Sequence, residues 1–161
     1  MIPLFIVSFI VFALYIIGIL ATFGIPHSIS DSFYLMEEKR NNLGYLFTLW
    51  CFFIAFSLIP VIFHLTEGEW FQFLGLFTCG GLGFVGAAPF FRGYEKTIHF
   101  TGAIVCAVTG FSWMVLSGYW RFPVVALLAA LYPAYKDKKW TFWGESALFL
   151  SMYATLSVML L

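Results

Sequence analysis

Long apolar stretches alternate along the chain with short polar gaps, and these gaps hold most of its eight basic and eight acidic residues. Each stretch approaches the roughly 20 residues that a helix needs to cross a bilayer. Hydrophobic residues make up 62% of the 161 residues and charged residues 10%, whereas charged residues form about a quarter of an ordinary soluble domain. The pattern therefore predicts an all-α fold, a polytopic transmembrane helical bundle that forms one domain over residues 1–161.

The hydrophobic stretches predict six helices, at residues 2–23, 43–64, 70–88, 99–119, 122–135 and 139–161. Residues 24–42 are predicted to form a polar loop, because they contain a run of turn-forming and charged residues. The fifth helix is short: its 14 residues span about 21 Å. The apolar core of a bilayer is about 30 Å thick, so this helix either crosses with local thinning or is reentrant.

Two of the predicted helices carry faces of small residues, which let membrane helices approach closely because no side chain separates their backbones. These residues are Gly75, Gly80, Gly81, Gly83 and Gly86 in the third helix, and Gly102, Ala103, Ala107 and Gly110 in the fourth. We expect the third helix to pack closely on a neighbour through Gly75, Gly83 and Gly86.

Basic residues indicate an orientation. Seven of the eight lie around the first, third and fifth loops, and only Arg121 lies on the other side of a six-helix bundle. The positive-inside rule then places those three loops in the cytoplasm and both termini outside. If the fifth helix does not cross, the basic residues divide equally and indicate no orientation. Because the net charge is zero, no basic face points to nucleic acid as a partner.

A few polar residues at one membrane face are the candidates for function. Six alternating helices bring Asp31, His99 and Glu145 to the same face, together with His27 and Ser30 in the first loop. A histidine and two carboxylates are the residues of an acid–base site or a zinc site, so the first three are the candidate catalytic residues. We assign His27 and Ser30 to binding. The residues come from separate helices, so their spacing identifies neither a metal nor another cofactor.

Glu145 is the most informative of these residues, because a carboxylate at the middle of a membrane span costs about 2.5–3.5 kcal/mol. One interpretation is that Glu145 reaches the headgroups or pairs with Lys139. The other is a partner inside the bundle, for which His99 and Asp31 are the candidates. His99 also fits a plain helix-capping role at the interface, and Ser30 and Asp31 fit local turn hydrogen bonds.

Three motifs resemble one membrane-protein family. The loop sequence PHSISDS at residues 26–32 is similar to the P-x-ISD-[TS] motif after the first helix of the Frag1/DRAM/Sfk1 family. The sequence CGGLGFVGAAPFF, followed by IHFTGA at residues 98–103, resembles the family's glycine-bearing third helix and the start of its fourth. Glu145, followed by aromatic sequence, resembles the acidic residue that opens the family's last helix.

The resemblance implies a role in membrane-lipid biology, since the family's members are associated with remodelling of lipid anchors, phospholipid distribution and autophagy in animals. It also implies a cytoplasmic N-terminus, which is opposite to the orientation that the basic residues indicate. This chain departs from the pattern after the ISD motif, where residues 37–40 are charged and the usual prolines are missing.

Three functions are therefore compatible with the sequence. The first is a protein that binds or remodels membrane lipid through the polar cluster, and its catalytic version would use His99 or a carboxylate to activate water. The second is a scaffold or assembly subunit that binds a second copy or a partner membrane protein through its glycine faces. The third is a small oligomeric transporter or channel. A pocket at the polar cluster favours the first function, and an exposed glycine-lined groove favours the second.

Overall fold

The computed structural model describes all 161 residues and shows an all-α protein without strands, as the sequence predicts. It contains seven α-helices and one 3-10 helix. Their bounds are α1 Ile2–Phe23, α2 Ser32–Lys39, α3 Tyr45–Leu65, α4 Gln72–Ala87, η1 Ala88–Phe90, α5 Glu95–Leu116, α6 Arg121–Asp137 and α7 Trp140–Leu160.

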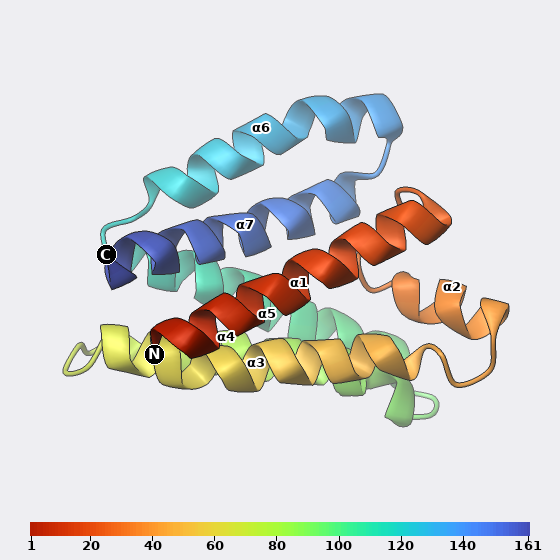
Figure 1. Cartoon of the computed structure of the whole chain (residues 1–161), viewed down its shortest axis with the longest axis horizontal. Helices are drawn as coiled ribbons and strands as arrows, with labels where there is room; N and C mark the ends of the chain where they lie inside the picture. The colour runs from red at the N-terminus through yellow and green to blue at the C-terminus, as the bar shows by residue number, and fades with distance from the viewer.

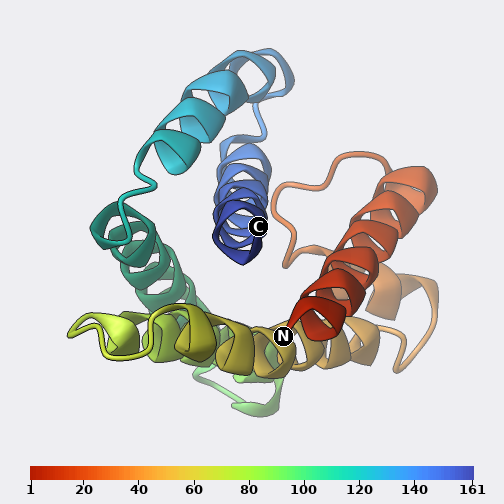
Figure 2. The same ribbon diagram turned by 60° about the vertical axis from the view of Figure 1, so that its left-hand side comes forward.

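The six long helices run alternately up and down. The connections after α1, α4 and α6 lie at one end of the molecule, and both chain termini lie at the other (Figure 1). We call the first end the basic end, because seven of the eight basic residues lie there. In the turned view, α7 stands inside an arc formed by the other long helices (Figure 2). This arrangement makes α7 the helix that faces the interior of the bundle.

Four helices are long and apolar enough to cross a membrane: α1, α3, α4 continued by η1 to Phe90, and α5. Their outward faces carry large apolar side chains, such as Leu14 and Phe56, which are 65% and 68% exposed. Apolar faces of this extent need lipid rather than water around them. The chain is therefore a multi-pass integral membrane protein.

One expectation about the first connection is wrong: part of residues 24–42 is helical. The short helix α2, Ser32–Lys39, turns its Ser32 and Met36 side chains inward, where both are buried. The Glu37 carboxylate accepts hydrogen bonds from the backbone N–H groups of Asn42 and Gly44, which fixes the turn after the helix. This helix is hard to recognise in the sequence, because it contains part of the charge run and only one of its faces is apolar.

Two helix backbones approach each other closely between α4 and α5, at Gly81 and Gly102. A Cβ atom on Gly81 would lie 2.6 Å from the backbone nitrogen of Cys106, and one on Gly102 would lie 2.8 Å from the Gly81 carbonyl oxygen. Real Cβ atoms do not come so close to backbone atoms. Glycine at these two positions therefore lets α4 and α5 touch along their backbones.

The other face of α4 packs on α3, also through glycines. A Cβ atom on Gly75 would collide with Ile62, and one on Gly86 would lie 2.6 Å from the Cβ atom of Cys51. Gly83 differs from the expectation, because its nearest neighbour would be a Phe52 ring atom at 3.7 Å, an ordinary contact. The sequence pattern did not distinguish the glycines that face a helix from one that faces a movable side chain.

Candidate functional site

The loop of residues 24–31 lies against the start of α7 and is held there by three hydrogen bonds. Loop residues 25, 27 and 29 bond to residues 139, 142 and 145, respectively, at the start of α7. The bonds run from Lys139 Nζ to the Ile25 carbonyl oxygen at 2.9 Å, from the Phe142 N–H to the His27 carbonyl oxygen at 3.0 Å, and from the Ile29 N–H to Glu145 Oε2 at 2.6 Å. We call this contact the loop–α7 strap.

The strap follows from unpaired backbone groups on both sides. The first N–H groups of a helix have no partner within the helix, and a loop inside a membrane protein cannot rely on water for its own backbone groups. The His27 carbonyl oxygen satisfies one free N–H of α7, and Glu145 satisfies the N–H of Ile29. Each segment thus supplies the partners that the other lacks.

Glu145 has a different partner from those considered in the sequence analysis. Its Oε2 atom accepts from the Ile29 backbone N–H, and it forms no ion pair with Lys139, whose Nζ atom instead donates to a loop carbonyl. Neither His99 nor Asp31 forms a hydrogen bond with it. Its other oxygen, Oε1, has no hydrogen-bond partner in the protein.

His99 is held by the same loop, one residue further on. Its Nε2 atom lies 3.2 Å from the Ser30 hydroxyl, which also forms a 2.9 Å hydrogen bond with the Ser28 hydroxyl. Glu145 and His99 therefore hold adjacent loop residues, Ile29 and Ser30, from two different helices. These predicted residues come together around residues 29–31 through the loop, without direct contact between their side chains.

Asp31 and His27 occupy the edge of this cluster. Asp31 begins α2, where its backbone N–H donates to the Ser28 hydroxyl at 3.1 Å, and its half-buried carboxylate makes no hydrogen bond. His27 is exposed, and it contributes its carbonyl oxygen to the strap while its imidazole has no partner. Their side chains are thus available to solvent or headgroups.

Two residues that the sequence analysis missed hold the loop from the α1 side. The Ser32 hydroxyl donates to the Ile29 carbonyl oxygen at 2.5 Å and pairs with the Tyr15 hydroxyl at 2.6 Å. Ser32 is completely buried. A tyrosine in an aromatic-rich helix and a serine in a polar loop carry no distinguishing signal, so the pair could not have been predicted from the sequence.

The arrangement does not complete a catalytic or metal site. A serine beside a histidine is the start of a nucleophile–base pair, but the base needs a third group to orient it, and His99 Nδ1 forms no hydrogen bond. No group of three or more His, Cys, Asp or Glu side chains lies close enough to hold a metal ion. The geometry suits the holding of a polar group better than it suits hydrolysis.

Beneath the loop lies a cavity that runs down the centre of the bundle. It is bounded by α3, α4, α5 and α7 and contains about 910 Å³ of space free of atoms, its open mouth included. Its lining extends along α3 from Phe47 to Ile62, a distance of about 22 Å. The cavity is thus long in the direction of the helices.

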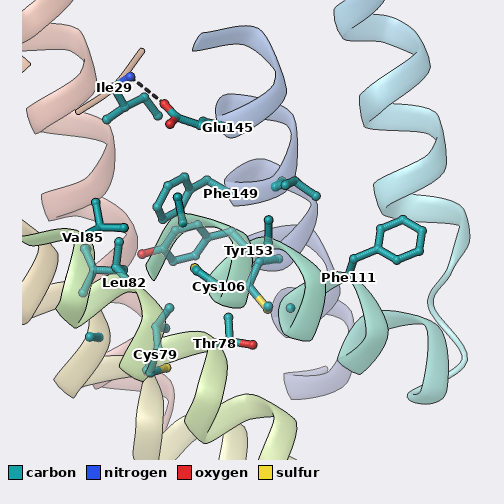
Figure 3. A pocket seen from close by; sticks show the side chains of 18 of the residues that line it. Ile29, Thr78, Cys79, Leu82, Val85, Cys106, Phe111, Glu145, Phe149 and Tyr153 are labelled. Carbon is teal, nitrogen blue, oxygen red and sulfur yellow. Dashed lines mark hydrogen bonds between the residues drawn. The ribbon is translucent and has the colours of Figure 1, made fainter. Parts of the chain in front are cut away.

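The cavity is apolar except for three residues, two of which lie at the end below the loop. Of its 23 lining residues 19 are hydrophobic, and the polar ones are Ser30, Thr78 and Glu145. The Thr78 hydroxyl is already bonded to the Leu74 carbonyl oxygen and to Thr109. Figure 3 shows the Ile29–Glu145 hydrogen bond at one end, with Phe149 and Tyr153 next along α7 and Thr78 and Cys79 at the far end.

Small residues on α5 help to keep this space open. Ala103, Ala107 and Gly110 line the cavity at the spacing of one helix face. The sequence analysis assigned them to helix packing, and a Cβ atom on Gly110 would lie 3.1 Å from Thr78. The two alanines line the cavity, and Ala103 also packs against the buried core.

A second hollow lies on the outer face of α4 and α5. Its lining includes Gly80, Gly81 and Gly102 together with Phe77 and Phe84. The structure thus contains a pocket at the polar cluster, the feature that favours lipid binding, and a glycine-lined hollow, the feature that favours assembly. The chain matches no family model, no curated protein and no solved structure.

Proposed function

We propose that this membrane protein binds one lipid-like molecule in its central cavity, with the alkyl chain along α3 and α7 and the polar head below the 24–31 loop. The observation that carries the proposal is the joining of a long apolar cavity to a single polar end formed by Ser30 and Glu145. Small-molecule sites share this form, with mostly apolar walls and a few polar groups that fix orientation.

Six membrane crossings fit this proposal. Helix α6 has 17 residues, about 25 Å, which nearly spans the apolar core of a bilayer, and α7 has 21 residues. With α6 and α7 inserted, the cavity lies at membrane depth, where lipid reaches it from the side. The resemblance to the Frag1/DRAM/Sfk1 family supports a lipid-related role by analogy only.

The test measures the lipid that the protein retains, and then blocks the cavity with a larger side chain. The protein is extracted with a styrene–maleic acid polymer, which keeps native lipid around it, and lipid retained after exchange into nanodiscs is measured by native mass spectrometry. In the Ala107→Phe variant a ring occupies the cavity, so the retained lipid should fall at least about tenfold. Val108→Phe is the matched control, because Val108 is 59% exposed on the outer face of the same helix.

The proposal is contradicted if wild-type protein retains no lipid, or if Ala107→Phe retains as much as Val108→Phe while both fold. Folding of each variant is checked by its thermal unfolding midpoint and by a single symmetric peak on size exclusion.

Assembly through the α4–α5 hollow is the second candidate function, and the glycine lining of that hollow favours it. Gly80→Leu tests it, since a Cβ atom at Gly80 meets nothing within 4 Å inside the chain. An assembling protein should lose its oligomeric state in native mass spectrometry while its lipid retention stays unchanged. A lipid-binding monomer should show no change in either measurement.

A further inference from the structure

We infer that the molecule held in the cavity has a single alkyl chain and a head that donates a hydrogen bond and carries no negative charge, such as a long-chain alcohol or amine. The inference rests on the proposed function, and it narrows that function to one class of ligand. It excludes fatty acids, alkyl phosphates and anionic phospholipids as the preferred occupants.

The charge of the cavity disfavours an anionic head. No Lys, Arg or His side chain lines it, and Glu145 is its only acidic residue. The basic residue of the strap, Lys139, has its Nζ atom bonded to the Ile25 carbonyl oxygen, and the imidazole of His99 is bonded to the Ser30 hydroxyl. An anionic head would thus be buried beside a carboxylate without a cation, which is costly in a site of low dielectric.

The free hydrogen-bonding atoms at the cavity favour a head that donates a hydrogen bond. The hydroxyls of Ser30, Thr78 and Tyr153 all have partners within the protein. Glu145 Oε1 does not, although Oε2 is bonded to Ile29. In its ionised form the Glu145 carboxylate accepts through Oε1, so the head that best satisfies this atom is a donor, either a hydroxyl or an ammonium group.

Trp50 also lines the cavity, and its Nε1 atom is buried without a hydrogen-bond partner. An indole N–H carries no charge, so it cannot neutralise an anionic head. It can donate to the oxygen of a hydroxyl head, which is then both donor and acceptor. Trp50 therefore does not weaken the case against anionic ligands.

The shape of the cavity fits a ligand with one chain. The lining extends for about 22 Å along α3 and includes side chains of α4, α5 and α7. The only polar group that offers a free acceptor stands at one end of this length. One extended chain with one head fits that form, and a lipid with two chains and a large headgroup does not.

The experiment compares four hexadecyl probes that carry the same photoreactive diazirine in mid-chain and differ only in the head: alcohol, amine, carboxylic acid and phosphate. Each is added to the protein in nanodiscs of phosphatidylcholine, and labelling of α5 and α7 peptides is divided by the amount of probe in the bilayer. Alcohol or amine should label the cavity at least about tenfold more than acid and phosphate. Preference for the alcohol indicates a hydroxyl ligand, and preference for the amine indicates an ion pair with Glu145.

The Glu145→Gln variant tests which atom makes the selection. Glutamine retains a carbonyl oxygen for the Ile29 N–H, and its amide NH₂ replaces Oε1 as the group that faces the head. Because NH₂ is a donor, labelling by the acid probe should rise relative to the alcohol probe, by about fivefold or more. Ala107→Phe should abolish labelling by every probe.

The results separate the inference from the function on which it rests. If acid or phosphate labels the wild-type cavity as strongly as alcohol and amine, the inference is overturned and the lipid-binding proposal stands. If no probe labels the cavity above the level of Ala107→Phe, the proposed function is overturned as well. An unchanged preference in Glu145→Gln would show that Glu145 does not select the head.

Discussion

The carboxylate of Glu145 accepts a hydrogen bond of 2.6 Å from the backbone N–H of Ile29, a residue 116 positions away in the sequence. This bond joins the last helix to the loop after the first helix, and it lies where the cavity ends. It explains how a carboxylate is accommodated in an apolar helix, because a buried charged acceptor needs a donor at close range. The same side chain thus fixes the loop and lines the end of the cavity.

Replacement of Glu145 by leucine should release the loop. The Ile29 N–H would lose its partner in a buried place, so we expect the free energy of unfolding to fall by about 1–3 kcal/mol. Glu145→Gln keeps an acceptor oxygen and should lose less than half as much. The measurement is unfolding by denaturing detergent, accompanied by amide hydrogen exchange of residues 24–31, which should become faster in the leucine variant.

Equal losses in the two variants would contradict this account, because the leucine variant alone removes the acceptor. So would unchanged exchange in residues 24–31, since the strap is the contact that this substitution opens.

How far the sequence predicted this site depends on the kind of interaction. Helix periodicity and alternation correctly predicted an all-α fold, and they brought Glu145 and His99 to one end of the bundle. They did not predict the partners, because Glu145 bonds a backbone N–H and every residue except proline carries one. Only the conformation of the 24–31 loop determines which N–H is unpaired and within reach.

The cavity was beyond the reach of sequence reasoning for a related reason. Ala103 and Ala107 have the same spacing as the small residues of a helix contact, and whether such a face meets a neighbour depends on where α7 stands. Gly81 and Gly83 show the same ambiguity within α4, since one touches a backbone and the other a movable ring.

A single added methyl group should therefore destabilise the contact between α4 and α5. Gly81→Ala places a Cβ atom 2.6 Å from the backbone nitrogen of Cys106, and neither backbone can move without separating the helices. We expect the free energy of unfolding to fall by about 1–3 kcal/mol. Gly80→Ala is the matched control on the next residue, where nothing lies within 4 Å, and its stability should be within about 0.5 kcal/mol of wild type.

Equal stability of Gly81→Ala and Gly80→Ala in the same unfolding experiment would show that α4 and α5 are less tightly packed than described.

The hydrogen bond between Tyr153 and Ser8 should contribute to the attachment of α7 to α1. The two hydroxyls are 2.7 Å apart and Ser8 is completely buried, so Tyr153→Phe leaves an unpaired hydroxyl. We expect a loss of about 0.5–1.5 kcal/mol in unfolding free energy, the range for hydrogen bonds between membrane helices. Tyr135→Phe, at a position that is 76% exposed, is the control and should change nothing.

A double variant with Ser8→Ala separates this bond from packing. If the bond is the cause, adding Ser8→Ala to Tyr153→Phe should cost little more, because no hydroxyl is then left unpaired. Full additivity of the two losses would mean that the hydroxyls act independently.

The number and direction of the crossings can be read from single cysteines at exposed positions. Asn41 lies at the basic end after α1, Glu67 at the opposite end after α3, and Lys136 at the basic end near the close of α6. With six crossings and the orientation that the basic residues indicate, a membrane-impermeant maleimide added outside intact cells should label Glu67→Cys and leave Asn41→Cys and Lys136→Cys unlabelled. The native Cys51 and Cys79 are buried, and the unaltered protein measures their background together with that of Cys106.

Each of the other labelling patterns has a single interpretation. Labelling of Asn41→Cys and Lys136→Cys without Glu67→Cys would keep six crossings and reverse the orientation, as the family resemblance implies. If only one of Lys136→Cys and Asn41→Cys is labelled, α6 does not cross the membrane. The four apolar helices already determine the sides of Asn41 and Glu67, so only the side of Lys136 depends on α6. In that case α6 and α7 would not stand in the bilayer as a crossing pair, and lipid would have to reach the cavity by another path.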